Sequence, residues 1–251
     1  MLRIVLPAYN EEAALEKLIV GISVAMQAAG LKYEIIVVND GSNDRTLEIA
    51  KNCGTALPVQ VIDHVQNKGL GEALKSGLKR AAELCNSGDV IVTMDADNTH
   101  PPDLIPTMIS NIEEGHDLVI ASRFVTGAKE YGLSLHRKVL SRGASILMRT
   151  LFPTKNVKDY TCGYRAYRSA ILQNAFASYG ETFICEKGFN AIVEILLKLR
   201  SHSLKACEVP LLLHYDRKEG ASKMPIMKTI LRYWTLIVHQ LIASRNKVFI
   251  A

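Results

Sequence analysis

The sequence predicts an α/β fold in which a mostly parallel sheet carries helices on both faces, and three observations support this. Short, continuously apolar runs alternate with longer segments of helical spacing through the first half of the chain. Strands that are buried on both faces of a parallel sheet have this pattern. The chain has 251 residues, of which 48% are apolar and 22% charged, so it can bury a full core. No repeat or low-complexity linker interrupts it, which favours one domain over 1–251.

The first half contains five expected strands with helices between them. Leu15, Leu18, Ile19 and Ile22 recur at helical spacing, as in an amphipathic helix after the first strand. Ser42 or Asn43 is expected to cap the next helix. The strands are expected at 4–6, 34–38, 59–62, 90–94 and 118–121, and the helices at 13–29, 43–53, 69–84 and 103–114.

The second half is less regular. It is expected to hold a loop at 122–134, a basic helix at 136–151, a strand at 161–168, a helix at 185–199, a strand at 207–214, a polar loop at 216–223 and a last helix at 225–243. The basic helix and the last helix combine a broad apolar side with basic residues, which is typical of helices that lie in a bilayer surface. Packing of these apolar sides on the sheet is one alternative, and docking to a small membrane-anchored partner subunit is another.

The charge is unevenly divided between the two halves. Residues 1–128 carry 10 Lys and Arg against 17 Asp and Glu, a net of −7, whereas 129–251 carry 20 against 8, a net of +12. The acidic half could hold a metal, and the basic half phosphate, nucleic acid or an anionic membrane.

Five Cys without a close pair argue against a disulfide framework or a zinc site and favour a reducing compartment. No signal peptide and no stretch of membrane-spanning length is expected.

Polar clusters follow four of the expected strands, at 7–11, 39–42, 67–71 and 95–97. Because ligands of such sheets bind beyond the carboxyl ends of the strands, all four clusters are expected at one edge. Asp95 and Asp97 are spaced to share a Mg²⁺ or Mn²⁺ ion with a substrate phosphate, although a solvated turn or a helix cap would use the same residues. Asp40 could accept hydrogen bonds from a base or ribose, or cap a helix. Lys68 with two glycines resembles a phosphate loop, but the dinucleotide and P-loop spacings are lacking.

Taken in order, the segments PAYNE, NDGS, NKGLG and DAD resemble family-2 glycosyltransferases, whose GT-A fold is Rossmann-like. The resemblance continues at 121–124, 141–144, 159–165, 208–210 and 222–223, where the chain is similar to dolichol-phosphate or polyprenyl-phosphate mannosyltransferases. It covers about residues 2–243. Two departures stand out, because Asn39 replaces a frequent Asp and Thr99 replaces a Gln that can help to hold the metal.

The resemblance implies a nucleotide-sugar-binding half at 1–121, an acceptor half at 122–224 and a C-terminal amphipathic helix at 225–251. The implied donor site consists of Pro7, Ala8, Tyr9, Glu11, Asp40, Lys68, Gly69, Asp95, Ala96, Asp97, Arg217 and Lys223. Within it, Asp95 and Asp97 would hold Mg²⁺ or Mn²⁺, and Arg217 and Lys223 would close over the phosphates. Arg123, Arg142 and Arg165 would face the acceptor phosphate, and Asp97, Arg123 and Arg142 would be the catalytic residues.

The chemistry of the acceptor agrees with this interpretation. A phosphate monoester has a second pKa near ~6, so a lipid phosphate is already a dianionic nucleophile and needs positive charge rather than a strong base. Arg pairs with phosphate oxygens through two parallel hydrogen bonds. The implied reaction is metal-dependent transfer of a hexose with inversion, with mannose from GDP-mannose as the first choice, onto a polyprenyl or dolichyl phosphate. The enzyme would act as a peripheral protein on the cytoplasmic face of a membrane.

Other functions remain open. A UDP-sugar such as UDP-glucose could be the donor, or a sugar or protein hydroxyl could be the acceptor, which would require a dedicated Asp or Glu base. A catalytically silent module that binds a nucleotide-sugar is a further alternative. Nucleic acid as a partner is disfavoured, because aromatics make up only 6% of the chain and no nucleic-acid-binding module is recognisable.

Overall fold

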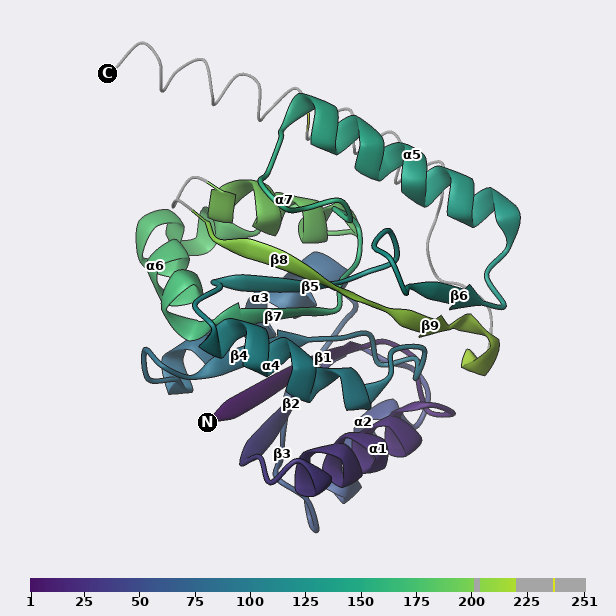
Figure 1. The fold of residues 1–251 in the computed structure, drawn as a ribbon. Helices are drawn as coiled ribbons and strands as arrows, with labels where there is room; N and C mark the ends of the chain where they lie inside the picture. The colour runs from purple at the N-terminus through teal and green to yellow at the C-terminus, as the bar shows by residue number, and fades with distance from the viewer. Residues whose placement is uncertain (201–203, 220–236, 238–251) are drawn as a thin grey trace.

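A seven-stranded sheet forms the centre of the protein (Figure 1). The computed structural model describes residues 1–200, 204–219 and 237. Its strand order is β3-β2-β1-β4-β7-β5-β8. The strands are β1 (Leu2–Ala8), β2 (Tyr33–Asp40), β3 (Val59–His64), β4 (Val90–Thr93), β5 (Leu118–Ser122), β7 (Arg165–Arg168) and β8 (Ala206–Pro210). All neighbours pair in parallel except β7, which runs antiparallel to both β4 and β5.

The strand order reverses between β1 and β4, and this reversal places the site. From β1 the chain moves outward to β2 and β3, and it then returns to the other side of β1 for β4. A crevice forms at such a switch point, beyond the carboxyl ends of the strands. Ala8 is in register with Asn39, so the loops that follow β1 and β2 begin at the same level.

Helices cover both faces of the sheet. One face carries α3 (Leu70–Leu84), α6 (Ser169–Tyr179) and α7 (Asn190–Leu199), and the other carries α1 (Leu15–Ala28), α2 (Thr46–Cys53) and α4 (Ile105–Glu113). Helix α5 (Leu135–Leu151) runs along the outside of this assembly (Figure 1). A small parallel sheet joins β6 (Lys129–Tyr131) to β9 (Leu212–His214). Single 3₁₀ turns are η1 (Pro102–Leu104), η2 (Gly180–Phe183) and η4 (Tyr215–Arg217).

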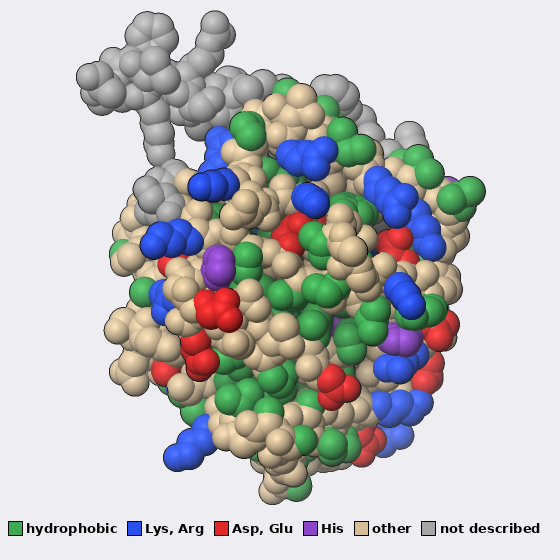
Figure 2. All heavy atoms as spheres, in the orientation of Figure 1, with side chains coloured by type: hydrophobic (Ala, Val, Ile, Leu, Met, Phe, Trp, Pro, Cys, Tyr) green, Lys and Arg blue, Asp and Glu red, His purple; other side chains and the backbone are tan. Residues whose placement is uncertain are grey.

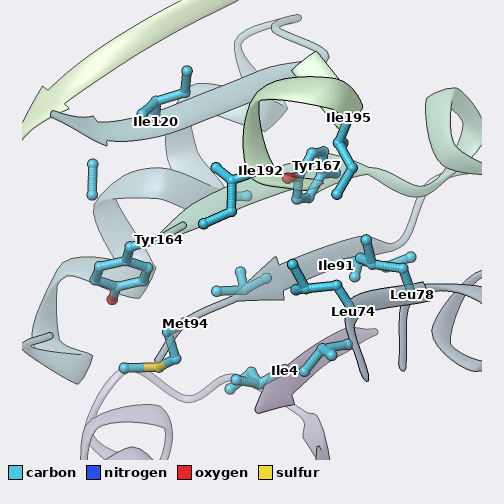
Figure 3. Packing of buried hydrophobic residues seen from close by; sticks show 14 of the residues in the cluster. Ile4, Leu74, Leu78, Ile91, Met94, Ile120, Tyr164, Tyr167, Ile192 and Ile195 are labelled. Atoms are coloured by element: carbon cyan, nitrogen blue, oxygen red, sulfur yellow. The ribbon is translucent and has the colours of Figure 1, made fainter. Parts of the chain in front are cut away.

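The core lies between the sheet and its helices. Figure 3 shows Leu74 and Leu78 of α3 beside Ile4 and Ile91 of the sheet, with Ile192 of α7 pointing toward the strands. Ile4, Leu78 and Ile91 are fully buried, and each such side chain contributes about 1.5–3 kcal/mol relative to an exposed one. The core thereby fixes the backbone from which the site loops leave.

The five strands and four helices expected in the first half are all present, and the fold class is confirmed. In the second half several expectations were wrong in detail, and of the strand expected at 161–168 only β7, at Arg165–Arg168, forms. Helix α6 and strand β6 were not expected, and α7 begins five residues later than predicted. The strand expected at 207–214 divides at Leu211, whose N–H donates to Ser122 O at 3.0 Å while its carbonyl accepts from Lys129 N at 3.0 Å. Leu211 is therefore where the chain leaves the main sheet for the small one.

Ser42 and Asn43 do not cap α2, contrary to the prediction. Ser42 Oγ accepts the N–H of Asn10 at 3.0 Å, and the N–H of Asn43 donates to Asn10 Oδ1 at 2.8 Å. Near the start of the helix it is Asp44 Oδ1 that accepts the N–H of Thr46, at 3.0 Å. The predicted capping residues instead tie the loop after β2 to the loop after β1.

Several predictions fall outside the described residues, among them Lys223 and almost all of the last helix expected at 225–243. In the part of the chain that is described, no helix has the length and apolarity needed to cross a membrane. All five cysteines are free thiols in the structure.

Candidate functional site

A cavity of about 1270 Å³ opens at the carboxyl ends of β1, β2 and β4. Eleven residues predicted from the sequence line it: Pro7, Ala8, Tyr9, Glu11, Asp40, Lys68, Gly69, Asp95, Ala96, Asp97 and Arg123. The polar clusters that follow the four strands therefore do converge, as the parallel topology requires.

Asp95 and Asp97 follow β4 and differ in their surroundings. Thr99 donates to Asp97 Oδ1 from Oγ1 at 2.6 Å and from its backbone N–H at 3.2 Å, while Lys218 Nζ contacts Asp97 Oδ2. Burial alone would raise the pKa of Asp97, but the Lys218 ammonium and these hydrogen bonds outweigh it and lower the pKa. Burial raises the pKa of Asp95, and the charge of Asp97 adds to this effect. The pair therefore attracts a cation.

The residues present fit a divalent metal ion. Both carboxylates line the cavity, and the ammonium of Lys218 already stands in for a cation on Asp97 Oδ2. Oxygen ligands of this kind suit Mg²⁺ and Mn²⁺, which usually keep several waters and substrate phosphates in their shells. Thr99, which stands where the resemblance implies a Gln, is held against Asp97 Oδ1. A metal here would depend on two carboxylates, with water and phosphate completing the shell.

Asp40 organises the loop before α3. Its buried carboxylate accepts the backbone N–H groups of Lys68 at 3.0 Å and Gly69 at 2.8 Å. His64 Nδ1 lies 2.8 Å from Asp40 Oδ1, and His64 Nε2 lies 2.9 Å from Ser76 Oγ. Since an ionised carboxylate only accepts hydrogen bonds, the ring proton belongs on Nδ1, and Ser76 donates to Nε2. Asp40 thus holds the predicted phosphate loop in place from within.

Gly69 is required at the start of α3. Its φ of +96° is unfavourable for any residue with a side chain, and an added Cβ would lie 2.3 Å from Lys187 O. Two residues on, the N–H of Gly71 donates to the same carbonyl at 3.0 Å. The segment before α7 therefore packs directly on the loop that Asp40 holds.

Arg123 is anchored by a buried carboxylate. Its Nε and Nη2 donate to the two oxygens of Asp159 at 2.8 and 2.7 Å, and Nη2 also donates to Thr161 Oγ1 at 2.6 Å. Burial alone would raise the pKa of Asp159, but Arg123 and backbone N–H groups lower it instead. Because Nε and Nη2 are engaged, Nη1 is the group of Arg123 best placed to bind a ligand in the cavity.

Arg165 was predicted to face the acceptor phosphate, but it does not line the cavity. It is completely buried in β7, where its guanidinium donates to Ile192 O at 2.7 Å and to Tyr160 O at 2.9 Å. Alternation along the strand points it into the protein, and its role is to bind two backbone carbonyls.

Arg142 and Arg217 are exposed and lie outside the cavity wall. Arg142 stacks on Phe124, with its guanidinium carbon 5.9 Å from the ring centroid, and Arg123 stacks on the same ring at 5.2 Å. Arg142 is thus a neighbour of Arg123 at the cavity edge. Lys223, the remaining predicted donor residue, lies beyond the described residues.

The structure adds cavity residues that the sequence motifs did not single out. Arg137 of α5 donates to the hydroxyl of Tyr215, and both line the cavity together with Lys218, His100 and Asn190. Arg137 is one of the arginines of the basic half that the sequence offers as candidates for binding phosphate, whereas nothing in the spacing of Lys218 distinguishes it from a surface residue. His100 accepts the N–H of Asp95 on Nδ1 at 3.2 Å, a contact made by the local turn.

Part of the cavity wall is apolar. This part includes Leu133, Val139, Leu140, Leu147, Met148, Leu211 and Leu213, most of them from α5 and its neighbourhood. A single cavity therefore joins an acidic end suited to a metal and a phosphorylated ligand with an apolar end suited to a hydrocarbon chain.

Known proteins with similar sequences agree with this architecture. A family model described as Glycosyl transferase family 2 matches residues 3–176. A dolichol-phosphate mannosyltransferase of Pyrococcus furiosus is 38% identical over 231 residues, which cover 92% of this chain and 60% of that protein. An undecaprenyl-phosphate 4-deoxy-4-formamido-L-arabinose transferase of Edwardsiella ictaluri is 29% identical over 237 residues, covering 93% and 66%. This chain thus spans less than two thirds of the length of these relatives.

Solved structures show the same fold. The glucosyl-3-phosphoglycerate synthase of Mycobacterium tuberculosis, in complex with Mn²⁺, UDP and phosphoglyceric acid, superposes with a TM-score of 0.67 at 21% identity, covering 97% of this chain and 78% of that one. The same enzyme in complex with Mg²⁺ and UDP gives a TM-score of 0.66 at 20% identity. With a family match over more than two thirds of its residues and a GT-A-like sheet around the predicted site, this chain belongs to glycosyltransferase family 2.

Proposed function

We propose that this protein transfers a hexose, with inversion, from a nucleotide-sugar to a polyprenyl or dolichyl phosphate, and that mannose from GDP-mannose is the first donor to test. The observation that carries this proposal is that one cavity is lined by Asp95 and Asp97, by Arg123 and by an apolar group of side chains, most of them from α5 and its neighbourhood. The names of the two relatives, which refer to dolichol phosphate and undecaprenyl phosphate, support a lipid phosphate as the acceptor.

At the donor end, Asp95 and Asp97 would hold Mg²⁺ or Mn²⁺, which supplies positive charge for the leaving nucleoside diphosphate. The residues that follow β1, among them Tyr9 and Glu11 in the cavity wall, would bind the nucleoside together with Asp40 at the end of β2. Lys68 lines the same wall and can contribute charge to the phosphates.

At the acceptor end, Arg123 and Arg137 would orient the lipid phosphate. The two are suited to this because a guanidinium stays charged and pairs with phosphate oxygens in a fixed geometry. The phosphate oxygen attacks the anomeric carbon, the bond to the nucleoside diphosphate breaks, and the configuration inverts in this single displacement. No side chain needs to remove a proton from a dianionic phosphate.

A hydroxyl acceptor fits the cavity less well. It would need a carboxylate base near the acceptor, whereas the carboxylates that line the cavity among the described residues all belong to the first half of the chain. Asp159 lies close to the acceptor end, but Arg123 engages both of its oxygens. A phosphate acceptor is therefore favoured.

Contact with a membrane surface is part of the proposal. On α5, Leu135 and Ile146 are 77% and 56% exposed, whereas Ser145 and Met148 face inward. Figure 2 shows hydrophobic and basic side chains interspersed along the part of the surface that α5 occupies in Figure 1. This composition suits a helix that lies in the headgroup region of an anionic bilayer, or one that docks to a small membrane-anchored partner subunit. The cytoplasmic face remains the predicted location.

Transfer assays with paired acceptors test the reaction. Purified protein with Mg²⁺ or Mn²⁺ is incubated with labelled GDP-mannose, UDP-glucose or other nucleotide-sugars, and with either a short polyprenyl phosphate or the corresponding polyprenol. We expect label only in the phosphate-linked lipid. Asp97→Asn should lose at least about a hundredfold in rate, as expected for loss of a metal-holding group, whereas the exposed Asp103→Asn should not. Transfer to polyprenol instead of the phosphate would overturn the acceptor assignment.

Liposome flotation tests the membrane contact. The double variant Leu135→Ser and Ile146→Ser should float less with anionic vesicles than the wild type, because two exposed apolar side chains are removed. Val24→Ser on α1, where Val24 is 61% exposed, is the matched control and should float normally. Equal flotation of all three proteins would mean that α5 does not enter the bilayer surface.

A further inference from the structure

Asn190, the first residue of α7, has a fully buried amide without a hydrogen-bond partner. In the described part of the chain, four buried side-chain polar atoms have no partner, and two of them are Oδ1 and Nδ2 of Asn190. The other two belong to Glu130 and Arg165, and neither of those residues lines the cavity. Asn190 belongs to the cavity wall but is 0% exposed, so a ligand in the cavity reaches its amide only after a neighbouring side chain moves aside.

Such an amide requires an occupant. Buried polar side chains are nearly always hydrogen-bonded, and leaving both halves of an amide unpaired is unfavourable. A leucine of similar size would avoid this penalty in the same wall. The presence of Asn190 therefore points to a group in the cavity that both accepts and donates hydrogen bonds.

The neighbours of Asn190 place it between the two parts of the donor end. Ala191 lies against the start of α3, because a Cβ added to Gly71 would be 3.1 Å from Ala191 Cβ. Ile192 lies close to Gly163, which in turn lies close to Asp95, since a Cβ added to Gly163 would be 3.1 Å from Ile192 Cδ1 and 3.5 Å from Asp95 Oδ1. Figure 3 shows Ile192 extending from α7 toward the sheet. The start of α7 is thus wedged between the phosphate loop and the metal pair.

A sugar is the ligand whose chemistry matches this position. The hexose of a nucleotide-sugar is attached to the diphosphate, so it lies next to the metal pair and away from the nucleoside. Each sugar hydroxyl donates one hydrogen bond and accepts others, and the Asn amide offers both an acceptor and a donor. The backbone N–H groups at the start of a ten-residue helix add a favourable dipole for the electron-rich hydroxyl oxygen.

We propose that Asn190 binds a hydroxyl group of the donor hexose and so helps to select the sugar. This inference rests on the proposed function, since it assumes a nucleotide-sugar in the cavity. It assigns to α7 a part in donor recognition that the sequence motifs do not indicate. A site built to bond a hydroxyl rejects an analogue that lacks it, because its own polar groups are then left unpaired.

Binding measurements without acceptor test the proposal. Calorimetry with Mn²⁺ compares the nucleotide-sugar with its nucleoside diphosphate for the wild type, Asn190→Leu and the control Asn174→Leu, whose residue is exposed on α6. We expect Asn190→Leu to bind the nucleotide-sugar about tenfold more weakly, the value of one good hydrogen bond, and the nucleoside diphosphate equally well. Thermal unfolding shows that the variant is folded, and its melting temperature should not fall.

A deoxy-sugar series identifies the hydroxyl. The nucleotide-sugar that lacks the contacted hydroxyl should bind equally to the wild type and to Asn190→Leu, whereas the other deoxy analogues should keep the difference. If the variant binds every nucleotide-sugar as the wild type does, Asn190 holds only buried water and the inference is overturned, while the proposed function stands. If the wild type binds no nucleotide-sugar of the panel, the proposed function itself fails.

Discussion

Lys218 contacts the Asp97 oxygen that a divalent cation would use, so removing its ammonium is expected to strengthen metal binding. The perturbation is Lys218→Met, which keeps the apolar stem and removes only the charge. Both side chains of the Lys218–Asp97 ion pair are 11% exposed, so solvent screens the contact weakly. A metal ion can reach Asp97 Oδ2 only after Lys218 has moved away.

The size of the effect follows from the contact that is lost. A hydrogen bond between charged groups contributes a net of about 1.5–3 kcal/mol. Since 1.4 kcal/mol corresponds to a factor of ten, the ion pair should weaken metal binding by about 10- to 100-fold. Lys218→Met should recover this factor, and the metal should also reach the site without displacing the 3₁₀ turn η4.

Manganese titration without nucleotide measures the change, either by calorimetry or by the spin resonance signal of free Mn²⁺. The exposed Lys155→Met serves as a control for the lost positive charge, and it should bind Mn²⁺ as the wild type does. Asp97→Asn should bind little Mn²⁺ in either background. If Lys218→Met binds Mn²⁺ with unchanged or lower affinity, Lys218 does not compete with the metal and the reasoning is refuted.

Three further predictions concern the second half. Asp159→Asn should lower the free energy of unfolding by about 3–5 kcal/mol, because Arg123 is left as an uncompensated buried charge. In the wild type, the stabilisation by the Asp159 carboxylate is present above about pH 4 and is lost as the pH falls through the lowered pKa of the folded state. The free energy of unfolding of the variant, measured with urea, should therefore change less between neutral and acidic pH. Arg165→Met should cost about 1–3 kcal/mol for each unpaired carbonyl in the same assay, yet leave the KM for polyprenyl phosphate unchanged. In maleimide labelling at pH 8 followed by mass spectrometry, exposed Cys185 should react first and Cys162 last, since burial raises the pKa of the Cys162 thiol to about 12.

The convergence of the polar clusters on one cavity could be predicted from the sequence, because topology does most of the positioning. A parallel sheet brings its strand ends together whatever the distance between them in sequence, so Asp40 and Asp97 needed only correct strand assignments. The acceptor end depends on contacts between side chains. The resemblance implies the same role for Arg123 and Arg165, but a buried Asp159 holds Arg123 at the cavity while strand alternation turns Arg165 inward.

Asn190 and Lys218 could not be predicted for a related reason. The proposed role of each residue depends on its neighbours in the folded structure. The buried amide of Asn190 has no hydrogen-bond partner, and Lys218 forms an ion pair with Asp97, which lies 121 positions away in the sequence. No local period or spacing encodes such a relation. The same limit explains Ser42, whose position before a helix suggested a cap although its hydroxyl binds the loop after β1.

At the site, basic residues of the second half of the chain lie against acidic residues of the first half. Lys218 of the basic half contacts Asp97 of the acidic half, and next to it Glu219 pairs with Lys17 of α1 at 2.6 Å. Two carboxylates as close as Asp95 and Asp97 would repel each other in a buried site, so the fold brings a cation from the second half to them. A divalent metal ion that binds a diphosphate can take the place of the Lys218 ammonium on Asp97. A neutral hydrogen-bond partner would not leave a position that favours a cation. The acidic residues and the basic loop therefore lie together at one end of the proposed donor site, to which both halves of the chain contribute.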